Sequence, residues 1–231
     1  MVERTHLTKV LAGAVAGTYP HPGGRLTVTP QPSERDAGVL AFTGHAVVFI
    51  DLDPDEVASL AGCDRDADGF ALRDLSAPLN PPFLTALAAR TGRRVNNIDQ
   101  LTLATPLPGP PPFALEPVRD AYAHPRLARA RRYRDDVRAW RARGGLLILG
   151  RGVAGRWEAA VEVDVDTRGR GLGRALAAAA RHLVPGGAPL WAQVAPGNAA
   201  SVRAFASAGY VPVGAEALLV ADRGAGTRGP T

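Results

Sequence analysis

The feature that most constrains this sequence is a glycine-rich turn, Arg168-Gly169-Arg170-Gly171-Leu172-Gly173. An alternating, strand-like run (157–165) precedes the turn, and an alanine-rich run with helical spacing of its apolar residues (172–184) follows it. The first-turn N–H groups of such a helix have no partner within the helix, and the helix dipole makes this end positive. We therefore predict a site for a phosphate or pyrophosphate, to which Arg168, Arg170 and Arg174 add charge.

Two common nucleotide-binding motifs do not match this turn. A P-loop requires Gly-x-x-x-x-Gly-Lys-Ser/Thr, but the chain has a single lysine, Lys9, far from the turn. A dinucleotide fold requires Gly-x-Gly-x-x-Gly and an acidic residue about 20 residues further on. The sixth position is Arg174 when counted from Gly169 and Leu176 when counted from Gly171, and residues 190–194 contain no acid.

The turn does match the pattern Arg-x-x-Gly-x-Gly, followed by a helix, a strand and a second motif. The second motif is the run Asn-Ala-Ala-Ser-Val-Arg-Ala-Phe at residues 198–205, which leads to the pair Gly209-Tyr210. With both motifs in this order and the strands interleaved, residues 145–222 resemble the GNAT superfamily of acyl-CoA-dependent N-acyltransferases. The resemblance implies that the first motif binds the pyrophosphate of coenzyme A and that Asn198 lies near the pantetheine arm.

The resemblance also implies a full set of contacts with acetyl-CoA. Main-chain N–H groups of Val163 or Val165 would polarise the thioester carbonyl, and Ser201 would face the pantetheine arm. Asn198 has a second interpretation, because it stands just before a predicted helix, where N-caps occur. Phe205 departs from the tyrosine that many relatives use to protonate the departing thiolate. The implied cofactor-binding residues are Val163, Val165, Arg168, Gly169, Arg170, Gly171, Leu172, Gly173, Arg174, Asn198, Ser201 and Phe205.

Acidic residues on the strand before the turn are the candidates for a general base. In the run 157–165, Glu158, Glu162 and Asp164 alternate with apolar residues and share one face, although acids are depleted in strands. Transfer to an amine requires a neutral nucleophile, so a carboxylate must take up its proton. Glu158 and Glu162 are equal candidates by position, whereas Asp164 is too close to the turn. The alternative is that this face is simply solvated.

The fold class predicted is α/β, with a GNAT-type mixed, partly antiparallel sheet flanked by helices and an additional N-terminal α/β region. We expect an irregular lead-in (1–37), an N-terminal α/β region (38–106), a proline-rich linker (107–112), a GNAT core (113–222) and a flexible tail (223–231). The N-terminal region would be a degenerate GNAT half or a subdomain on the acceptor side. Pattern and turn signals predict strands at 39–52, 95–104, 137–142, 146–149, 157–165, 190–194 and 211–220, and helices at 54–60 (with Asp53 as the N-cap), 83–90, 126–134, 172–184 and 199–208.

Composition and apolar patterning limit where the protein is located and whether it binds a metal. No apolar run approaches the ~20 residues of a membrane span, the N-terminus does not read as a secretory signal, and the single cysteine, Cys63, excludes an internal disulfide. These features predict a cytoplasmic protein without a metal site. The acid-rich run at 64–69 begins like a calcium loop, but its twelfth position is Leu75, so we interpret it as a surface turn. The predominance of arginine, glycine and proline is typical of a bacterial genome rich in G and C.

Three functions follow from these patterns. The first is transfer of an acetyl or short acyl group from coenzyme A to an amine of a small molecule or peptide, by direct attack in a ternary complex. The second is a non-catalytic acyl-CoA-binding module, which the phenylalanine at position 205 suggests. The third is nucleic-acid binding through the arginine-rich helix at 126–134, for which a solvated helix surface is the simpler interpretation. We expect neither a nucleic-acid nor a membrane partner, and a homodimer would be usual for the family.

Overall fold

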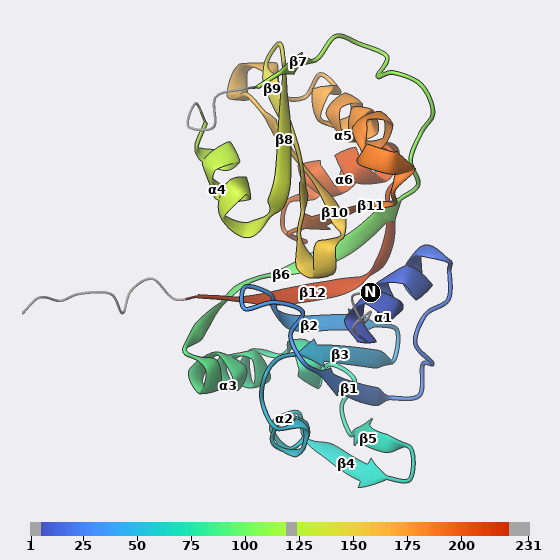
Figure 1. Cartoon of the computed structure of the whole chain (residues 1–231), viewed down its shortest axis with the longest axis vertical. Coiled ribbons are helices and arrows are strands. Elements are labelled where there is room, and N and C mark those ends of the chain that lie inside the picture. The colour runs from blue at the N-terminus through green and yellow to red at the C-terminus, as the bar shows by residue number, and fades with distance from the viewer. Residues whose placement is uncertain (1–5, 119–123, 222–231) are drawn as a thin grey trace, which may run out of the picture. The chain divides into compact units, whose positions relative to one another are not determined.

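A computed structural model describes residues 6–118 and 124–221, which form an α/β fold (Figure 1). The helices, in chain order, are α1 (His6–Val15), α2 (Pro54–Leu60), α3 (Pro81–Thr91), α4 (Pro125–Tyr133), α5 (Leu172–Leu183) and α6 (Ala199–Ser207). Short 3-10 segments are η1 (Ala77–Leu79), η2 (Val153–Gly155), η3 (Val165–Thr167) and η4 (Pro185–Gly187). The strands are β1 (Arg25–Thr29), β2 (Ala37–Phe42), β3 (His45–Phe49), β4 (Cys63–Asp66), β5 (Gly69–Leu72), β6 (Arg93–Ala104), β7 (Glu116–Pro117), β8 (Asp135–Ala142), β9 (Gly145–Arg151), β10 (Trp157–Val163), β11 (Leu190–Val194) and β12 (Val211–Ala221).

The chain divides into two compact units, which are described separately. Unit 1 comprises residues 1–98 and 214–231, and unit 2 comprises residues 99–213, so that β6 and β12 contribute to both. This division differs from the boundary expected at 107–112, because that proline-rich run lies within unit 2 and is held against α5. The N–H group of Leu107 donates to the Arg181 carbonyl oxygen at 2.8 Å, and His182 Nδ1 lies 3.0 Å from the Pro108 carbonyl oxygen.

Unit 1 contains a mixed sheet in the order β4-β5-β1-β3-β2-β12, in which β1 and β3 run parallel and the other neighbours antiparallel. Its core joins the sheet to α2 and α3 through buried Val57, Phe83 and Leu87. The predicted start of α2 is confirmed, since the Asp53 side chain accepts from the N–H groups of Asp55 and Glu56.

Two expectations for unit 1 were wrong. The lead-in at 1–37 is not irregular over its described part, because α1 buries Leu7, Leu11 and Ala14 at helical spacing and β1 joins the sheet. The apolar run at 39–52 is not one strand but the hairpin β2–β3, which turns at Gly44 with φ of +64°. A buried apolar run gives no period that would reveal such a turn, and only the backbone freedom of glycine marks it.

The acidic run at 64–69 forms the end of the hairpin β4–β5, in agreement with the predicted surface turn. Its carboxylates pair with arginines: Asp66 Oδ1 lies 2.6 Å from Arg25 NH1, and Asp64 pairs with Arg73. The hairpin is therefore tied to β1 by side-chain charge as well as by its ladder.

Unit 2 contains the sheet order β6-β11-β10-β9-β8-β7, and its described strands are antiparallel except for the parallel pair β10–β11. Strand β9 is buried on both faces, as the run Leu146-Leu147-Ile148-Leu149 predicted. Leu147 and Leu149 pack with α5 and α6, whereas Leu146 and Ile148 pack with Leu127 of α4. Helix α4 therefore covers one face of the sheet, and α5 and α6 cover the other (Figure 1).

The elements of unit 2 were largely predictable. Strand β11 has the predicted bounds, and α4, α5, α6 and β12 agree within one residue of the prediction at each end. Strand β10 ends at Val163, two residues early, so that Val165 lies in η3 with 71% of its surface exposed. Residues 222–231, which include the expected tail, lie outside the described residues. No described helix is both long enough and apolar enough to cross a membrane.

Candidate functional site

The glycine-rich turn lies between β10 and α5, and two of its glycines allow the backbone to turn there. Gly169 and Gly171 have φ of +75° and +82°, a left-handed conformation that residues with a Cβ rarely adopt. Gly171 is the N-cap of the twelve-residue helix α5 and provides no side-chain hydrogen bond to its first turn. A Cβ at either glycine would meet no described atom within 4 Å, so the turn is open on this side. The local fold thus presents uncapped N–H groups at the positive end of a helix.

Arginine side chains surround this helix end. Arg168, Arg170 and Arg174 are all exposed, and they outnumber Asp164 and Asp166 in the same stretch of chain. Arg168 Nε donates to the carbonyl oxygen at the end of β10, that of Val163, at 3.2 Å, which holds this guanidinium beside the strand. The arrangement fits a diphosphate, because it combines backbone N–H groups with exposed positive charges.

Strands β10 and β11 are hydrogen-bonded only at the start of β10. Their ladder consists of two pairs, Trp157 with Leu190 and Glu158 with Trp191. Beyond these pairs β10 stays paired with β9, and β11 stays paired with β6 along its whole length. The sheet therefore opens between two neighbouring parallel strands, on the way to the glycine-rich turn.

Beyond Glu158, the main-chain groups of β10 that face β11 are not part of the ladder between these two strands. The Asp164 N–H group donates to the Gly144 carbonyl oxygen at 2.9 Å, which places the even-numbered residues in the bonded pairs with β9. By alternation, the N–H groups of Val161 and Val163 point toward the β11 side. An extended ligand that itself carries amide groups can bind such an edge in the manner of an added strand.

Glu158 lies in a buried charge network where the strands part. The residue is 3% exposed, and its Oε2 atom accepts from Arg134 Nε at 2.8 Å. Its Oε1 atom accepts from Arg156 Nε at 2.9 Å and from Gln193 Nε2 at 2.7 Å. Burial alone would raise the pKa of Glu158, but the charges of Arg156 and Arg134 outweigh it and lower the pKa below its usual range. A carboxylate held in this way is a poor proton acceptor, which argues against Glu158 as the base.

Glu162 lies on the same strand face as Glu158 but is more open, with 35% of its side chain exposed. His124 Nε2 lies 3.7 Å from its Oε1 atom, and Arg126 NH1 lies 3.7 Å from its Oε2 atom. Both distances exceed that of a direct hydrogen bond, so the carboxylate is oriented without being sequestered. His124 Nδ1 accepts the Arg126 N–H group at 3.2 Å, and it is the other ring nitrogen, Nε2, that lies on the side of Glu162. Of the two candidates, the geometry favours Glu162 as base.

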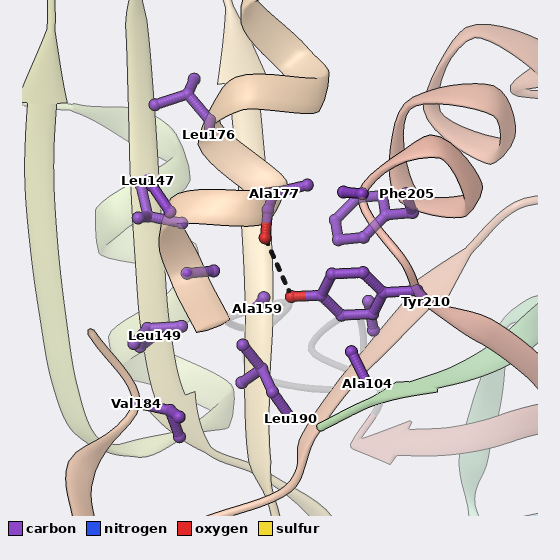
Figure 2. Close-up of a cluster of buried hydrophobic side chains, with 14 of the residues drawn as sticks. Ala104, Leu147, Leu149, Ala159, Leu176, Ala177, Val184, Leu190, Phe205 and Tyr210 are labelled. Atoms are coloured by element: carbon purple, nitrogen blue, oxygen red, sulfur yellow. Dashed lines mark hydrogen bonds between the residues drawn. The ribbon is translucent and has the colours of Figure 1, made fainter. Parts of the chain in front are cut away.

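The second motif has one residue at the surface and one in the core. Asn198 caps α6, because its Oδ1 atom accepts the Ser201 N–H group at 3.1 Å, and its Nδ2 group is not used by this cap. Phe205 is 4% exposed and packs edge-on against Tyr210, with ring centroids 4.9 Å apart (Figure 2). Phe205 therefore belongs to the apolar core, and its expected role as a cofactor contact is not supported. Exposed Val165 lies beyond the strand, so its N–H group does not extend the edge of β10.

Sequence reasoning missed the partners of Glu158. Arg156 could have been found, because it precedes Glu158 by two residues and so shares its side of the chain. Arg134 was assigned to a solvated helix surface, yet only 14% of its side chain is exposed. Gln193 gave no signal, since nothing in a sequence shows which residues meet across two strands. Trp191 is 2% exposed, and its ring lies under the Arg156 guanidinium, whose central carbon is 5.4 Å from the ring centroid.

Comparison with known proteins adds one distant similarity. No family model matches the sequence, and a search of curated proteins returns no significant match. Among solved structures, the chain is similar to a GCN5-related N-acetyltransferase from Kribbella flavida, with 19% sequence identity and a TM-score of 0.42. The similarity covers 83% of this chain and 90% of that one. A likeness at this level does not establish a common fold or function.

Proposed function

We propose that the chain transfers an acetyl or other short acyl group from coenzyme A to an amine. The observation that carries this proposal is the parting of β10 from β11 beside the glycine-rich turn, both within unit 2. Coenzyme A joins a diphosphate to a long extended arm with two amide groups, and the two features match these two parts. The resemblance of the two sequence motifs to the GNAT superfamily supports the same assignment.

The residues that would hold acetyl-CoA are those of the turn and of the open strand edge. The first-turn N–H groups of α5, with Arg168, Arg170 and Arg174 around them, would bind the diphosphate. The N–H groups of Val161 and Val163 would receive the arm, with the Asn198 amide on its other side. The thioester supplies an acyl group that is already activated toward attack by an amine.

In the proposed reaction, Glu162 accepts a proton from the acceptor amine as its nitrogen forms a bond to the acyl carbon. A main-chain N–H group of this open strand edge stabilises the negative charge that develops on the carbonyl oxygen. The carbon–sulfur bond then breaks, and coenzyme A leaves as a thiolate, which takes its proton from water because Phe205 offers none. Cys63 is not proposed as a nucleophile, since burial raises the pKa of its thiol and so disfavours the thiolate.

The experiment that tests this proposal is thermal unfolding of the full chain with and without acetyl-CoA. Ligand at about 100 times its dissociation constant should add roughly 2.7 kcal/mol to the free energy of unfolding. The Gly171→Glu variant should lose this shift, because it places a negative charge at the helix end. Gly186→Glu is the matched control, since Gly186 has a φ of +65° and open space around it but lies beyond the far end of α5.

Absence of a shift with acetyl-CoA and with longer acyl-CoA thioesters would contradict the proposal, as would equal loss in both glutamate variants. A shift without turnover of any amine would favour the second candidate, a non-catalytic acyl-CoA-binding module. The observation that favours this second candidate is the burial of Phe205 in the core, because the chain then has no proton donor at that position for the departing thiolate.

A further inference from the structure

Positive side chains gather on the face of β10 that carries Glu162. Helix α4 contributes Arg126 and Arg129, and Arg134 follows at its end. The helix is fixed on this face by its buried Leu127 and Ala130, which pack against Ala160 between the two glutamates of β10. Packing of the helix thus fixes the backbone positions from which these arginines extend.

The carboxylates near these arginines neutralise their positive charges to different extents. Glu158 is already shared between Arg134 and Arg156, which are two cations on one anion. Arg126 has one charged partner in the described part of the chain, Glu162, at 3.7 Å. The planar guanidinium has five N–H donors, and 45% of the Arg126 side chain is exposed, so this residue is partly open to solvent beside the proposed base.

The surroundings of Arg126 destabilise its charged form relative to an arginine in water. Partial burial lowers its pKa, Glu162 opposes this effect, and nearby Arg134 and Arg129 lower the pKa further. A ligand that brought a negative charge to this guanidinium would relieve the repulsion among the three arginines. A ligand that brought several positive charges would increase it.

We propose that the acceptor is an amine with a carboxylate close to its reacting nitrogen, and that Arg126 binds this carboxylate beside Glu162. This inference rests on the proposed function and narrows it to a class of acceptor. An α-amino acid carries both groups on one carbon, and Glu162 and Arg126 are close enough to receive one group each. Arginine binds carboxylates through two parallel hydrogen bonds, which also orients the amine. We expect polyamines and aminoglycosides to be poor acceptors, because their positive charges would meet the arginines of this face.

The test uses pairs of acceptors that differ in one charge. The full chain is given acetyl-CoA and each common L-amino acid or the corresponding amino-acid amide, with spermidine as a polycation, and release of the coenzyme A thiol is measured. We expect kcat/KM for the best acid to exceed that for its amide by about 10- to 100-fold, as for loss of a hydrogen bond to a charged group. The same pairs are compared by the thermal stabilisation that they add to the protein saturated with coenzyme A.

Variants of α4 assign the preference to one side chain. Arg126→Gln should lower turnover of the acid more than turnover of the amide, so that the acid-to-amide ratio comes close to 1, and Arg126→Lys should restore part of the ratio. Arg131→Gln, at an exposed position on the same helix, should leave the ratio unchanged. A merely structural role of Arg126 would lower both rates together, so the ratio separates binding from folding.

Several outcomes would overturn the inference. These are a preference for amides or for spermidine, an acid preference that survives Arg126→Gln, and a panel in which no acid is turned over or stabilises the protein more than its amide. If acetyl-CoA still shifts the unfolding temperature in such a case, the proposed function stands and only the acceptor class fails. If acetyl-CoA does not bind, both fail together.

Discussion

The Gln193 side-chain amide donates to Glu158 Oε1 at 2.7 Å, at the place where β10 and β11 stop pairing. Arg134 joins the same group, because its NH2 atom lies 3.3 Å from Gln193 Oε1 while its Nε atom binds Glu158. Side chains thus connect the two strands where the backbone ladder ends. We infer that this network fixes where the sheet opens, and that Glu158 positions the site without taking part in the reaction.

The first prediction concerns the charge of Glu158. The change Glu158→Gln should lower the free energy of unfolding by about 3–5 kcal/mol, because it leaves Arg134 and Arg156 buried without their carboxylate. Urea denaturation followed by circular dichroism measures this loss. The control is Glu162→Gln, which should cost about 1 kcal/mol or less, since its contacts are partly exposed and long. Equal losses in the two variants would mean that burial of the network contributes nothing.

The second prediction concerns the space around the same carboxylate. A Cβ on Gly152 would overlap the Glu158 carboxylate, so Gly152→Ala should force it away from its partners and cost about 1–3 kcal/mol. Gly197→Ala is the control, because no described atom lies within 4 Å of the added Cβ there. The denaturant midpoints of both variants are compared with that of the parent chain. An unchanged midpoint for Gly152→Ala would show that the Glu158 network accommodates the added methyl group without loss of stability.

The third prediction is a dependence of stability on alkaline pH. Burial raises the pKa of Tyr210 well above its usual value, and its hydroxyl donates to the Ala177 carbonyl oxygen at 3.3 Å (Figure 2). Above pH of about 10 the unfolded chain loses this proton while the folded chain keeps it, so stability falls by about 1.4 kcal/mol per pH unit from this group. In Tyr210→Phe this part of the slope should disappear, at a cost near neutral pH of about 1 kcal/mol.

Unfolding in urea between pH 9 and 11 measures this slope in the variant and the parent chain. Tyr19→Phe is the matched control, because 44% of Tyr19 is exposed, and it should leave the slope unchanged. Identical slopes for Tyr210→Phe and the parent would show that Tyr210 ionises without unfolding.

The fourth prediction concerns the chemistry of Glu162. If the proposed function holds, Glu162→Gln should lower kcat by about 10²- to 10⁴-fold, the usual contribution of a general base. The thermal shift with acetyl-CoA should be retained, because Glu162 is not among the residues proposed to hold coenzyme A. Cys63→Ala, a change on β4 in the other unit, should leave kcat unaltered. Full activity of Glu162→Gln would assign proton removal to water or to another group.

Much of unit 2 was predictable because its signals are local. The glycines at 169 and 171 are required by a left-handed backbone, and the helix after them follows from the spacing of its apolar residues. Prediction from local patterns failed where neighbouring residues carry no signal of the structure they adopt. The apolar run at 39–52 concealed a hairpin, and residues 107–112 resembled a linker although they pack on α5.

By itself, the sequence determined the α/β class, the glycine-rich turn before a helix and the strand that carries both candidate acids, because each depends on the period and chemistry of neighbouring residues. Only the tertiary structure separated Glu158 from Glu162. The two acids share a strand face and a residue type, and they differ in what distant segments bring to them. Arg134, Arg156 and Gln193 bury the charge of Glu158, whereas His124 and Arg126 orient Glu162 at a distance. The environment of an ionisable group is set by through-space contacts, which the order of residues along a chain does not specify.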